Sequence, residues 1–321
     1  MILVFQRFFH LSQIISFALT KKRHTVYLFN ISLAIGGLLR DSIYFELLKK
    51  KRHKRVVFFR GWNPSFENKI ENNRILRTWL HYTFLKADRI IVLSSQFQLR
   101  LREWGYKGPI SLETTAVDDT LLEGVDWQNL QANRQDTHQP QLLYLGNISK
   151  AKGVWEVTQA LEYLNGRDKS PHVQLTIAGG GKELNSLKEN VENNNLSVHF
   201  PGYVRGKQKA EIYKQSHLFV FASYHEGMPN AVLEAMAFGL PVITTRVGGI
   251  PDFFEEGKMG FFLDNRDPEH IAEKIQYLLD RPELMKEISE YNYHYAKEHF
   301  YASKVAARLE KIIDNVAEER V

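Results

Sequence analysis

Two glutamates, Glu226 and Glu234, lie eight positions apart in the stretch EGMPNAVLE, directly after the apolar run HLFVFAS. Pro229 stands between them, and proline suits the beginning of a helix because it has no backbone N–H and its φ angle is preset. A helix is therefore predicted to begin near Pro229 and to stop at Gly239. Both carboxylates would then flank one helix start, where free backbone amides and the helix dipole favour an anion.

Two further loops carry residue types that can approach phosphate groups. The turn GNISKAKG follows an apolar run and precedes a helical pattern, so Lys152 lies near another predicted helix start. The loop AGGGKEL is rich in glycine, but the dinucleotide pattern G-x-G-x-x-G starting at Gly179 would need a glycine where Leu184 stands. A hydride-transfer enzyme is therefore not favoured, and these glycines could equally serve a tight strand-to-helix turn.

Such groups need a scaffold that brings distant loops together. From Thr25 onward, short apolar runs alternate with helical patterns, which is typical of βαβ units around a parallel sheet. We therefore predict an α/β fold with two Rossmann-like domains. Strands are predicted at residues 25–32, 55–61 and 89–95 in the first half, and at 141–147, 173–181, 197–204, 217–223, 241–247 and 260–264 in the second.

The two halves of the chain are unequal. The first half begins with residues 1–24, an apolar segment interrupted by polar side chains, where a strand with a glycine-bearing phosphate turn would be expected. This segment is predicted to be an amphipathic helix packed on a sheet, with a membrane-surface helix as the alternative. The predicted organisation is an N-terminal domain at 1–127 that is shortened at its start, a polar linker at 128–140, a C-terminal domain at 141–290, and a helix at 291–321 that returns to the first domain.

The composition limits the class of protein and of partner. The chain has 321 residues, of which 44% are hydrophobic and 25% charged, so it can bury a large core. It contains no cysteine, which excludes disulfides and thiolate nucleophiles and fits the cytosol. The net charge of +5 favours an anionic partner, such as a nucleotide phosphate, a membrane surface or a nucleic acid. No nucleic-acid-reading motif accompanies the basic run LLKKKRHKR at 47–55, so a solvated helix end or an anionic membrane surface is favoured there.

The segment HLFVFASYHEGMPNAVLEAMAFGLPVITTRVGGIPDFF resembles the donor-binding segment of the group 1 glycosyltransferases, also called family 4, which are retaining enzymes of the GT-B fold. The resemblance continues through YLGNISKAKGVWEVTQAL, LTIAGGGKEL and FPGYV, so it covers the second half densely and the first half loosely. It implies that Glu226 contacts the hydroxyls of a donor sugar and that Glu234 holds the nucleotide ribose. For Glu234 alone, a solvated helix residue would be the alternative.

The resemblance also implies which residues surround the nucleotide. Lys152 matches a lysine that braces the leaving diphosphate, with a surface lysine as the alternative, whereas Asn147 stands where the family usually has an arginine. Arg60 stands where the family often has a histidine, and it could contact a hydroxyl or phosphate or form a structural ion pair. The implied donor-binding set is Asn147, Lys152, Gly180, Gly181, Tyr203, Val204, Arg205, Glu226, Gly227, Met228, Pro229, Asn230, Ala231 and Glu234, and the candidate catalytic residues are Glu226, Lys152 and Arg60.

The predicted function is that of a retaining glycosyltransferase, which moves a sugar from a nucleoside diphosphate sugar to a hydroxyl acceptor in cell-surface polysaccharide or glycolipid synthesis. No further cofactor and no bound metal are expected, because no histidine and carboxylate pair at metal-ligand spacing stands beside the motif. The expected location is the cytoplasm, or the cytoplasmic face of a membrane if the acceptor is lipid-linked. Two alternatives stay open: a catalytically silent module that binds sugar nucleotides, and an epimerase of the GT-B fold.

Overall fold

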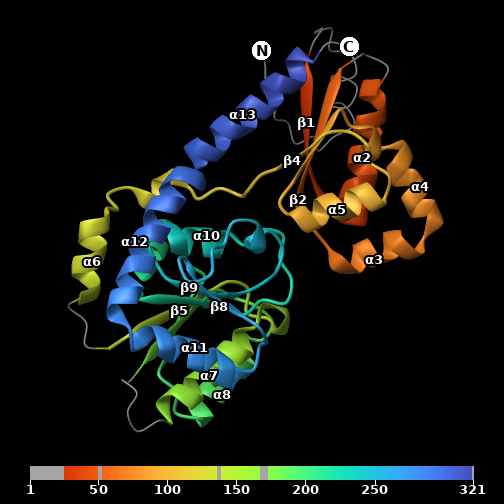
Figure 1. The fold of residues 1–321 in the computed structure, drawn as a ribbon. Coiled ribbons are helices and arrows are strands. Elements are labelled where there is room, and N and C mark those ends of the chain that lie inside the picture. Colours follow the sequence, from red (N-terminus) through yellow and green to blue (C-terminus); the bar gives the residue numbers. More distant parts are fainter. Residues whose placement is uncertain (1–24, 50–52, 136–138, 167–172, 320–321) are drawn as a thin grey trace. The chain divides into compact units, whose positions relative to one another are not determined.

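The computed structural model describes residues 25–49, 53–135, 139–166 and 173–319, and it divides into two compact units, each built around its own parallel sheet (Figure 1). The first unit contains residues 1–114 and residues from 306 onward, and the second contains residues 115–305. Two parallel sheets with helices between their strands confirm the predicted α/β class. The predicted helix at residues 1–24, and with it the shortened start of the first domain, lies outside the described residues.

The described residues of the first unit form four strands in the order β1-β2-β3-β4, and each neighbouring pair is parallel. β1 to β3 confirm the three predicted strands, whereas β4 was missed because its three residues are too short a pattern to recognise. The strands are β1 Val26–Leu33, β2 Lys54–Trp62, β3 Arg89–Val92 and β4 Ile110–Leu112, and the helices between them are α2 Ile35–Lys49, α3 Pro64–Asn72, α4 Arg74–Tyr82 and α5 Ser95–Glu103.

The second unit has six parallel strands in the order β10-β9-β8-β5-β6-β7, which confirms the six strands predicted for this half. The strands are β5 Gln141–Leu145, β6 Gln174–Ala178, β7 Val198–Gly202, β8 Leu218–Phe221, β9 Val242–Thr245 and β10 Gly260–Leu263. The helices are α6 Trp127–Gln135, α7 Val154–Asn165, α8 Leu184–Asn193, α9 Gly206–Gln215, α10 Asn230–Ala237, α11 Pro268–Leu279 and α12 Pro282–His299.

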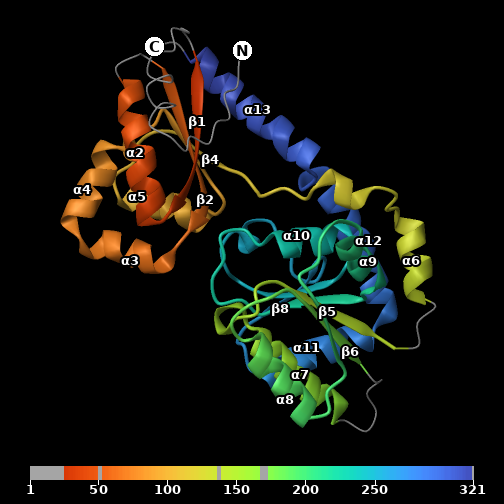
Figure 2. The same cartoon turned by 180° about the vertical axis from the view of Figure 1, so that it is seen from behind.

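Helices cover both faces of this second sheet. α7, α8 and α11 lie on one face, α9 and α10 lie on the other, and α12 contacts both α10 and α11 (Figures 1 and 2). Every residue of β8 and β9 is buried, as expected for central parallel strands between two helical layers. The site-bearing loops therefore leave a sheet whose strands are held firmly from both sides.

The predicted linker at 128–140 is wrong for most of its length, because residues 127–135 form α6 within the second unit. Arg134 on this helix is buried and donates to the carbonyl oxygens of Phe238 at 2.7 Å and Gly239 at 3.1 Å, which lie just after α10. Burial lowers the pKa of Arg134 to about 9. The two carbonyls have no partner within their own helix, so Arg134 satisfies them. Gln128 and Asn129 on α6 are exposed, which fits the polar composition of the segment.

The boundary between the units also differs from the predicted one. Residues 115–127 belong to the second unit, where the Asp119 carboxylate accepts from the amides of Ala302 at 2.8 Å and Ser303 at 3.1 Å. The predicted helix at 291–321 is divided between α12 and α13 (Ala302–Glu318). From residue 306 on, the chain belongs to the first unit, where Arg308 pairs with Glu113 at 2.6 Å. The return of the C-terminal segment is therefore present, but it begins later than predicted.

Candidate active site

The strand order of the second sheet brings two loops together. β5 pairs with β6 on one side and with β8 on the other, so the strand order reverses between β5 and β8. In open parallel sheets, ligands bind outside the carboxyl ends of the strands at such a switch point. Residues 146–153 leave the sheet here after β5, and residues 222–229 leave it after β8. These two loops contain Lys152 and Glu226.

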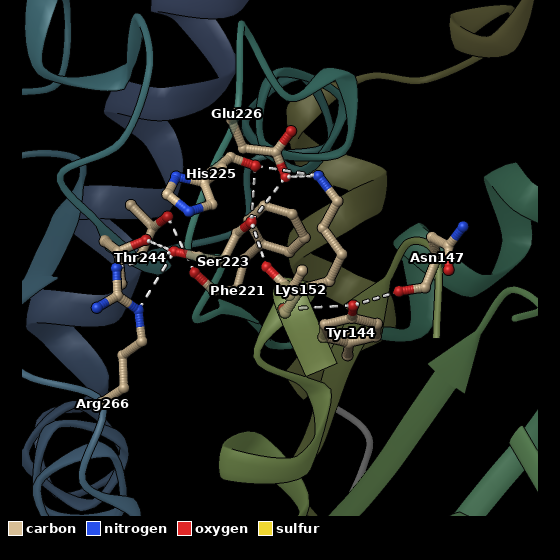
Figure 3. A network of polar contacts seen from close by, with 11 residues as sticks. Tyr144, Asn147, Lys152, Phe221, Ser223, His225, Glu226, Thr244 and Arg266 are labelled. Atoms are coloured by element: carbon tan, nitrogen blue, oxygen red, sulfur yellow. Dashed lines mark hydrogen bonds and ion pairs between the residues drawn. The ribbon is translucent and has the colours of Figure 1, made fainter. Parts of the chain in front are cut away.

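Lys152 and Glu226 form an ion pair across the switch point. The Lys152 ammonium lies 2.5 Å from Glu226 Oε1 and 3.2 Å from the carbonyl oxygen of His225 (Figure 3). Both side chains are largely buried, with 27% of Lys152 and 12% of Glu226 exposed. Lys152 is therefore not the freely solvated surface lysine of the alternative interpretation. The sequence placed each residue near a helix start but did not predict that they touch.

A glycine permits this close approach. Lys152 ends the short 3-10 turn η3 (Lys150–Lys152), and Gly153 follows with a φ of 68° before α7 begins. A Cβ atom on Gly153 would lie 2.0 Å from the carbonyl oxygen of Ala222, directly after β8. Any other residue would strain the backbone and push the turn away from β8. Gly153 thus holds Lys152 within reach of the loop that carries Glu226.

Ser223 fixes the Glu226 carboxylate from the end of β8. Its hydroxyl donates to Glu226 Oε1 at 2.9 Å, the same oxygen that the Lys152 ammonium contacts (Figure 3). No group among the described residues donates to Glu226 Oε2. The Ser223 carbonyl accepts from Thr245 Oγ1 at 2.6 Å and from Arg266 Nη2 at 3.2 Å, which anchors the loop. One carboxylate oxygen is thus fixed by protein donors, and the other can accept from a ligand hydroxyl.

The helix that carries Glu234 confirms the predicted boundaries. Pro229 is the N-cap residue of α10, and Gly239 follows the helix end with a φ of 65°. Glu234 is only 7% exposed, so the alternative of a solvated helix residue is wrong. The Lys209 ammonium lies 2.6 Å from both of its carboxylate oxygens, and the Tyr213 hydroxyl donates to Oε2 at 2.9 Å.

The start of α10 carries backbone donors without protein partners. Within the described part of the chain, nothing accepts a hydrogen bond from the N–H groups of Gly227, Met228, Asn230 or Ala231, and Pro229 has no N–H. The first amides of a helix have no partner inside the helix, and together with the dipole they form a ready anion site. This predicted part of the site is therefore chemically suited to a diphosphate.

The remaining glycines of the predicted site differ in what they do. A Cβ atom on Gly181 would lie 2.2 Å from the carbonyl oxygen of Ile148, so tight packing of the two turns explains that glycine. A Cβ atom on Gly180 would meet nothing within 4 Å, so packing does not explain this one. Asn147, in the neighbouring turn, is exposed, and its carbonyl oxygen accepts from the Tyr144 hydroxyl at 3.0 Å (Figure 3).

Tyr203, Val204 and Arg205 lie after β7, and the family resemblance implies that they border the nucleotide base. Tyr203 is 70% exposed, and the Arg205 guanidinium lies 4.7 Å from the centroid of its ring. Val204 between them is buried and supports the turn. An exposed ring beside a cation can stack against a base. That role for Tyr203 and Arg205 stays a prediction.

Arg60 lies near the end of β2, in the first unit. Its side chain is exposed, and its guanidinium lies 5.0 Å from the centroid of the Phe58 ring. In the described ranges Arg60 makes no ion pair, so the structural ion pair considered for it is not observed. Its contact with a donor or acceptor stays a prediction.

Two basic residues of the run at 47–55, His53 and Arg55, pack within the first unit. His53 is buried, and Arg55 lies over the Phe45 ring at 4.2 Å and donates to the Lys86 carbonyl at 2.9 Å. Burial lowers the pKa of Arg55. Residues 50–52 lie outside the described residues, so attraction to an anionic membrane stays a prediction that depends on them.

Two features are absent from the described ranges. No helix there is both long and apolar enough to cross a membrane. No group of three or more histidine, aspartate or glutamate side chains is placed to hold a metal ion there. Metal independence itself stays a prediction.

Sequence reasoning missed Ser223, Lys209 and Tyr213, which hold the two glutamates. Ser223 ends the apolar run before Glu226, and a hydroxyl at the end of a buried strand was an available signal. Lys209 and Tyr213 lie four residues apart on α9, a spacing that places both on one helix face. That spacing does not reveal which acid they meet, because the answer depends on how α9 and α10 pack.

Comparison with known proteins identifies the family. The family model described as glycosyl transferases group 1 matches residues 125–295. The chain is 32% identical over 178 residues to the spore coat protein SA of Bacillus subtilis (strain 168), covering 52% of this chain and 47% of that protein. It is 29% identical over 230 residues to the capsular polysaccharide biosynthesis glycosyltransferase CapM of Staphylococcus aureus, covering 71% of this chain and 58% of CapM. The chain thus spans about half the length of the curated relatives it matches.

Solved structures share the fold. HepE of Anabaena, solved in complex with UDP, superposes with a TM-score of 0.76 at 16% identity, covering 95% of this chain and 81% of that one. A glycosyltransferase from Rickettsia africae superposes with a TM-score of 0.66 at 16% identity, covering 93% of this chain and 100% of that one. These likenesses confirm the GT-B fold that the resemblance predicted. Together with the family match over the second unit, they lead to one conclusion: the chain belongs to the group 1 glycosyltransferases.

Proposed function

We propose that this chain is a retaining glycosyltransferase that uses a nucleoside diphosphate sugar as donor. The observation that carries the proposal is the ion pair between Lys152 and Glu226 at the switch point, beside the free amides at the start of α10. A cation for the diphosphate and an acceptor for sugar hydroxyls thus lie within one hydrogen bond of each other. This is the arrangement that a diphosphate sugar needs at the bond that breaks.

In the proposed reaction, the bond between the anomeric carbon and the diphosphate oxygen breaks, and a bond to the acceptor oxygen forms on the same face of the sugar. The proton of the acceptor hydroxyl passes to the departing diphosphate oxygen, so the balance needs neither a protein nucleophile nor a metal ion. Negative charge grows on the diphosphate during this step. Lys152 and the α10 amides would stabilise that charge more strongly in the transition state than in the ground state.

Donor binding would change the partners of Lys152. An incoming diphosphate carries more negative charge than one carboxylate, so it would compete with Glu226 for the ammonium group. Glu226 would then offer Oε1 as well as Oε2 to the sugar hydroxyls, while Ser223 continues to hold it. Glu234 would accept from the hydroxyls of the ribose. The same ion pair thus keeps both groups in place before the donor arrives.

The acceptor is proposed to be a hydroxyl group in cell-surface polysaccharide or glycolipid synthesis. The relative CapM, a glycosyltransferase of capsular polysaccharide biosynthesis, supports the polysaccharide part of this proposal. A lipid-linked acceptor would place the protein at the cytoplasmic face of a membrane. Sedimentation with vesicles of phosphatidylglycerol, compared with neutral phosphatidylcholine vesicles, would test that placement.

The proposed function is tested by turnover. Purified protein is incubated with a panel of radiolabelled nucleotide sugars and total membrane lipid, and the products are separated by chromatography. We expect one donor to transfer its label to an acceptor, with the anomeric configuration of the donor retained. Binding without transfer or hydrolysis for every donor would favour a silent sugar-nucleotide module. An isomerised nucleotide sugar formed without acceptor would favour an epimerase.

A further inference from the structure

Glu234 is held by two side chains of one helix that have no part in the proposed chemistry. Lys209 and Tyr213 lie one turn apart on α9, so both leave the same face of the helix. Lys209 Nζ lies 2.6 Å from Glu234 Oε1 and 2.6 Å from Oε2, and the Tyr213 hydroxyl lies 2.9 Å from Oε2. The carboxylate therefore cannot rotate without breaking at least one of these contacts.

These contacts leave room for a ligand. Lys209 donates a hydrogen bond to Oε1 and Tyr213 donates one to Oε2, while the contact of Lys209 with Oε2 is an ion pair. Each carboxylate oxygen has two lone pairs, so each oxygen of Glu234 keeps one lone pair that can accept a further hydrogen bond. The 2′ and 3′ hydroxyls of a ribose are neighbours on the same side of the ring, and they present two donors to one acceptor group. A carboxylate whose plane is fixed can receive both, whereas a rotating carboxylate would first have to be ordered, which costs conformational entropy.

Burial makes the lysine necessary for this arrangement. Only 9% of the Glu234 side chain and 20% of the Lys209 side chain are exposed. A buried carboxylate without a counter-charge is strongly disfavoured and would turn toward solvent or recruit another cation. The Tyr213 hydroxyl is also buried, and it lies 3.3 Å from the carbonyl oxygen of Ala231 at the start of α10. α9 therefore sets the direction of Glu234 relative to the start of α10.

We infer that Lys209 and Tyr213 are positioning residues through which the site selects a ribonucleotide over its 2′-deoxy counterpart. The inference rests on the proposed function, because it assumes that Glu234 meets the ribose of the donor. The selection would come from the fixed carboxylate: losing the 2′ hydroxyl leaves one of its two preset acceptors without a donor. A polar group built to receive a hydroxyl discriminates strongly against a ligand that lacks it.

The test measures a ratio of affinities. UDP, ADP, GDP and CDP are first compared by the rise in Tm that each causes, and the base with the largest rise is carried forward with its 2′-deoxy form. Calorimetry then gives Kd for both forms with the parent protein and with Lys209→Met, Lys209→Arg and Tyr213→Phe. Lys207→Met is the matched control, because Lys207 is an exposed lysine on the same helix. Circular dichroism checks folding.

We expect the parent protein to prefer the ribonucleotide by about tenfold or more, the effect of one hydrogen bond to a charged group. Lys209→Met should reduce this preference to about threefold or less, mainly by weakening ribonucleotide binding, while Lys209→Arg restores part of it. Tyr213→Phe keeps the ion pair between Lys209 and Glu234, so its preference for the ribonucleotide should lie between those of the parent and of Lys209→Met. Lys207→Met should bind as the parent does.

Each other outcome separates the inference from the function it rests on. Equal weakening of both nucleotide forms by Lys209→Met, with the ratio unchanged, would mean that Lys209 only supports the fold. A parent protein that binds nucleotides without preferring ribose would overturn the inference and leave the proposed function standing. If the parent binds no nucleoside diphosphate at all, the proposed function fails and the inference fails with it. If Lys209→Met does not fold, the inference is tested with Tyr213→Phe, by the same ratio of Kd for the 2′-deoxy form to Kd for the ribonucleotide.

Discussion

The two glutamates of the donor segment have matching partners in different geometries. Each carboxylate contacts one ammonium and one hydroxyl group, from Lys152 and Ser223 at Glu226, and from Lys209 and Tyr213 at Glu234. At Glu226 both donors converge on Oε1, whereas at Glu234 they cover both oxygens. Glu226 lies in a loop at the switch point, and Glu234 lies inside a helix.

This difference means that the Glu226 carboxylate can change partners, whereas the orientation of the Glu234 carboxylate is fixed. Lys152 comes from the turn after β5, where a diphosphate would also bind, so its contact with Glu226 can be exchanged for a contact with substrate. Lys209 and Tyr213 come from helix α9, which contributes none of the proposed diphosphate contacts, so they would hold Glu234 with or without a donor. The first carboxylate is therefore suited to the reacting sugar, and the second to the part of the donor that only has to be recognised.

The largest effect is expected at the exchangeable pair. Lys152→Ala should lower kcat by about 10² to 10³, because a donor aimed at developing charge is worth that much, and should raise KM less. Lys152→Arg should recover only part, because a planar guanidinium does not replace a compact ammonium. Steady-state kinetics on the donor found in the turnover screen measures both constants. Turnover of Lys152→Ala at the parent rate would contradict the assignment of Lys152 to the leaving group.

The neighbouring lysine sharpens this prediction. Lys150 is exposed in the same turn, and Asn147 stands where a second cation was expected by resemblance. Lys150→Ala should change kcat by less than about twofold, as most exposed substitutions are nearly neutral. If Lys150→Ala is impaired as strongly as Lys152→Ala, Lys150 has taken the role of the missing cation.

A smaller effect is expected at the hydroxyl that holds Glu226. Ser223→Ala removes a hydrogen bond to a charged group, which is worth about 1.5 to 3 kcal/mol, so kcat/KM should fall by about tenfold or more. Ser216→Ala is the matched control, since Ser216 is also buried but donates to the Ile212 carbonyl. If kcat/KM falls equally in the two variants, the buried serines matter only for folding. The Tm of each variant separates a loss of stability from a loss of activity at the site.

The smallest effect concerns stability at the preset carboxylate. Burial, and then the charge of Glu234, raises the pKa of the Tyr213 phenol well above its usual value. In the unfolded chain the phenol ionises near pH 10, whereas the folded protein keeps the proton, so this contribution to stability is complete below about pH 10 and is lost as the pH rises further. Tyr213→Phe should reduce the fall in Tm per pH unit above pH 10 by roughly 2 to 4 °C. Identical falls in the parent and the variant would contradict the buried, neutral phenol.

The sequence predicted well what depends on neighbouring residues. The start and stop of α10 follow from Pro229 and Gly239, because proline and glycine act on the backbone where they stand. The strands of both units were found from short apolar runs, since parallel strands buried on both faces leave a strong local signal. The linker prediction failed because the partners of Arg134, among them the carbonyl oxygens of Phe238 and Gly239, lie far away in the sequence.

The contacts inside the site could not be predicted in the same way. The pairing of Lys152 with Glu226 depends on β5 and β8 being neighbours, which is a property of strand order. The pairing of Lys209 with Glu234 depends on how α9 and α10 lie on the same face of the sheet. Sequence spacing identifies the candidate groups, whereas the packing of the sheet decides which of them meet.

The central claim is that Glu226 binds the donor sugar and Glu234 binds the nucleotide ribose. One set of binding measurements tests it most directly. Calorimetry compares the preferred nucleoside diphosphate with its nucleotide sugar, on Glu226→Ala and on Glu234→Ala. Glu234→Ala should raise Kd for both ligands by about tenfold or more, because the ribose is common to them. Glu226→Ala should weaken only the nucleotide sugar, and should leave the nucleoside diphosphate unchanged or bound more tightly by the released Lys152. Equal losses on both ligands for both variants, or unchanged diphosphate binding by Glu234→Ala, would contradict the account.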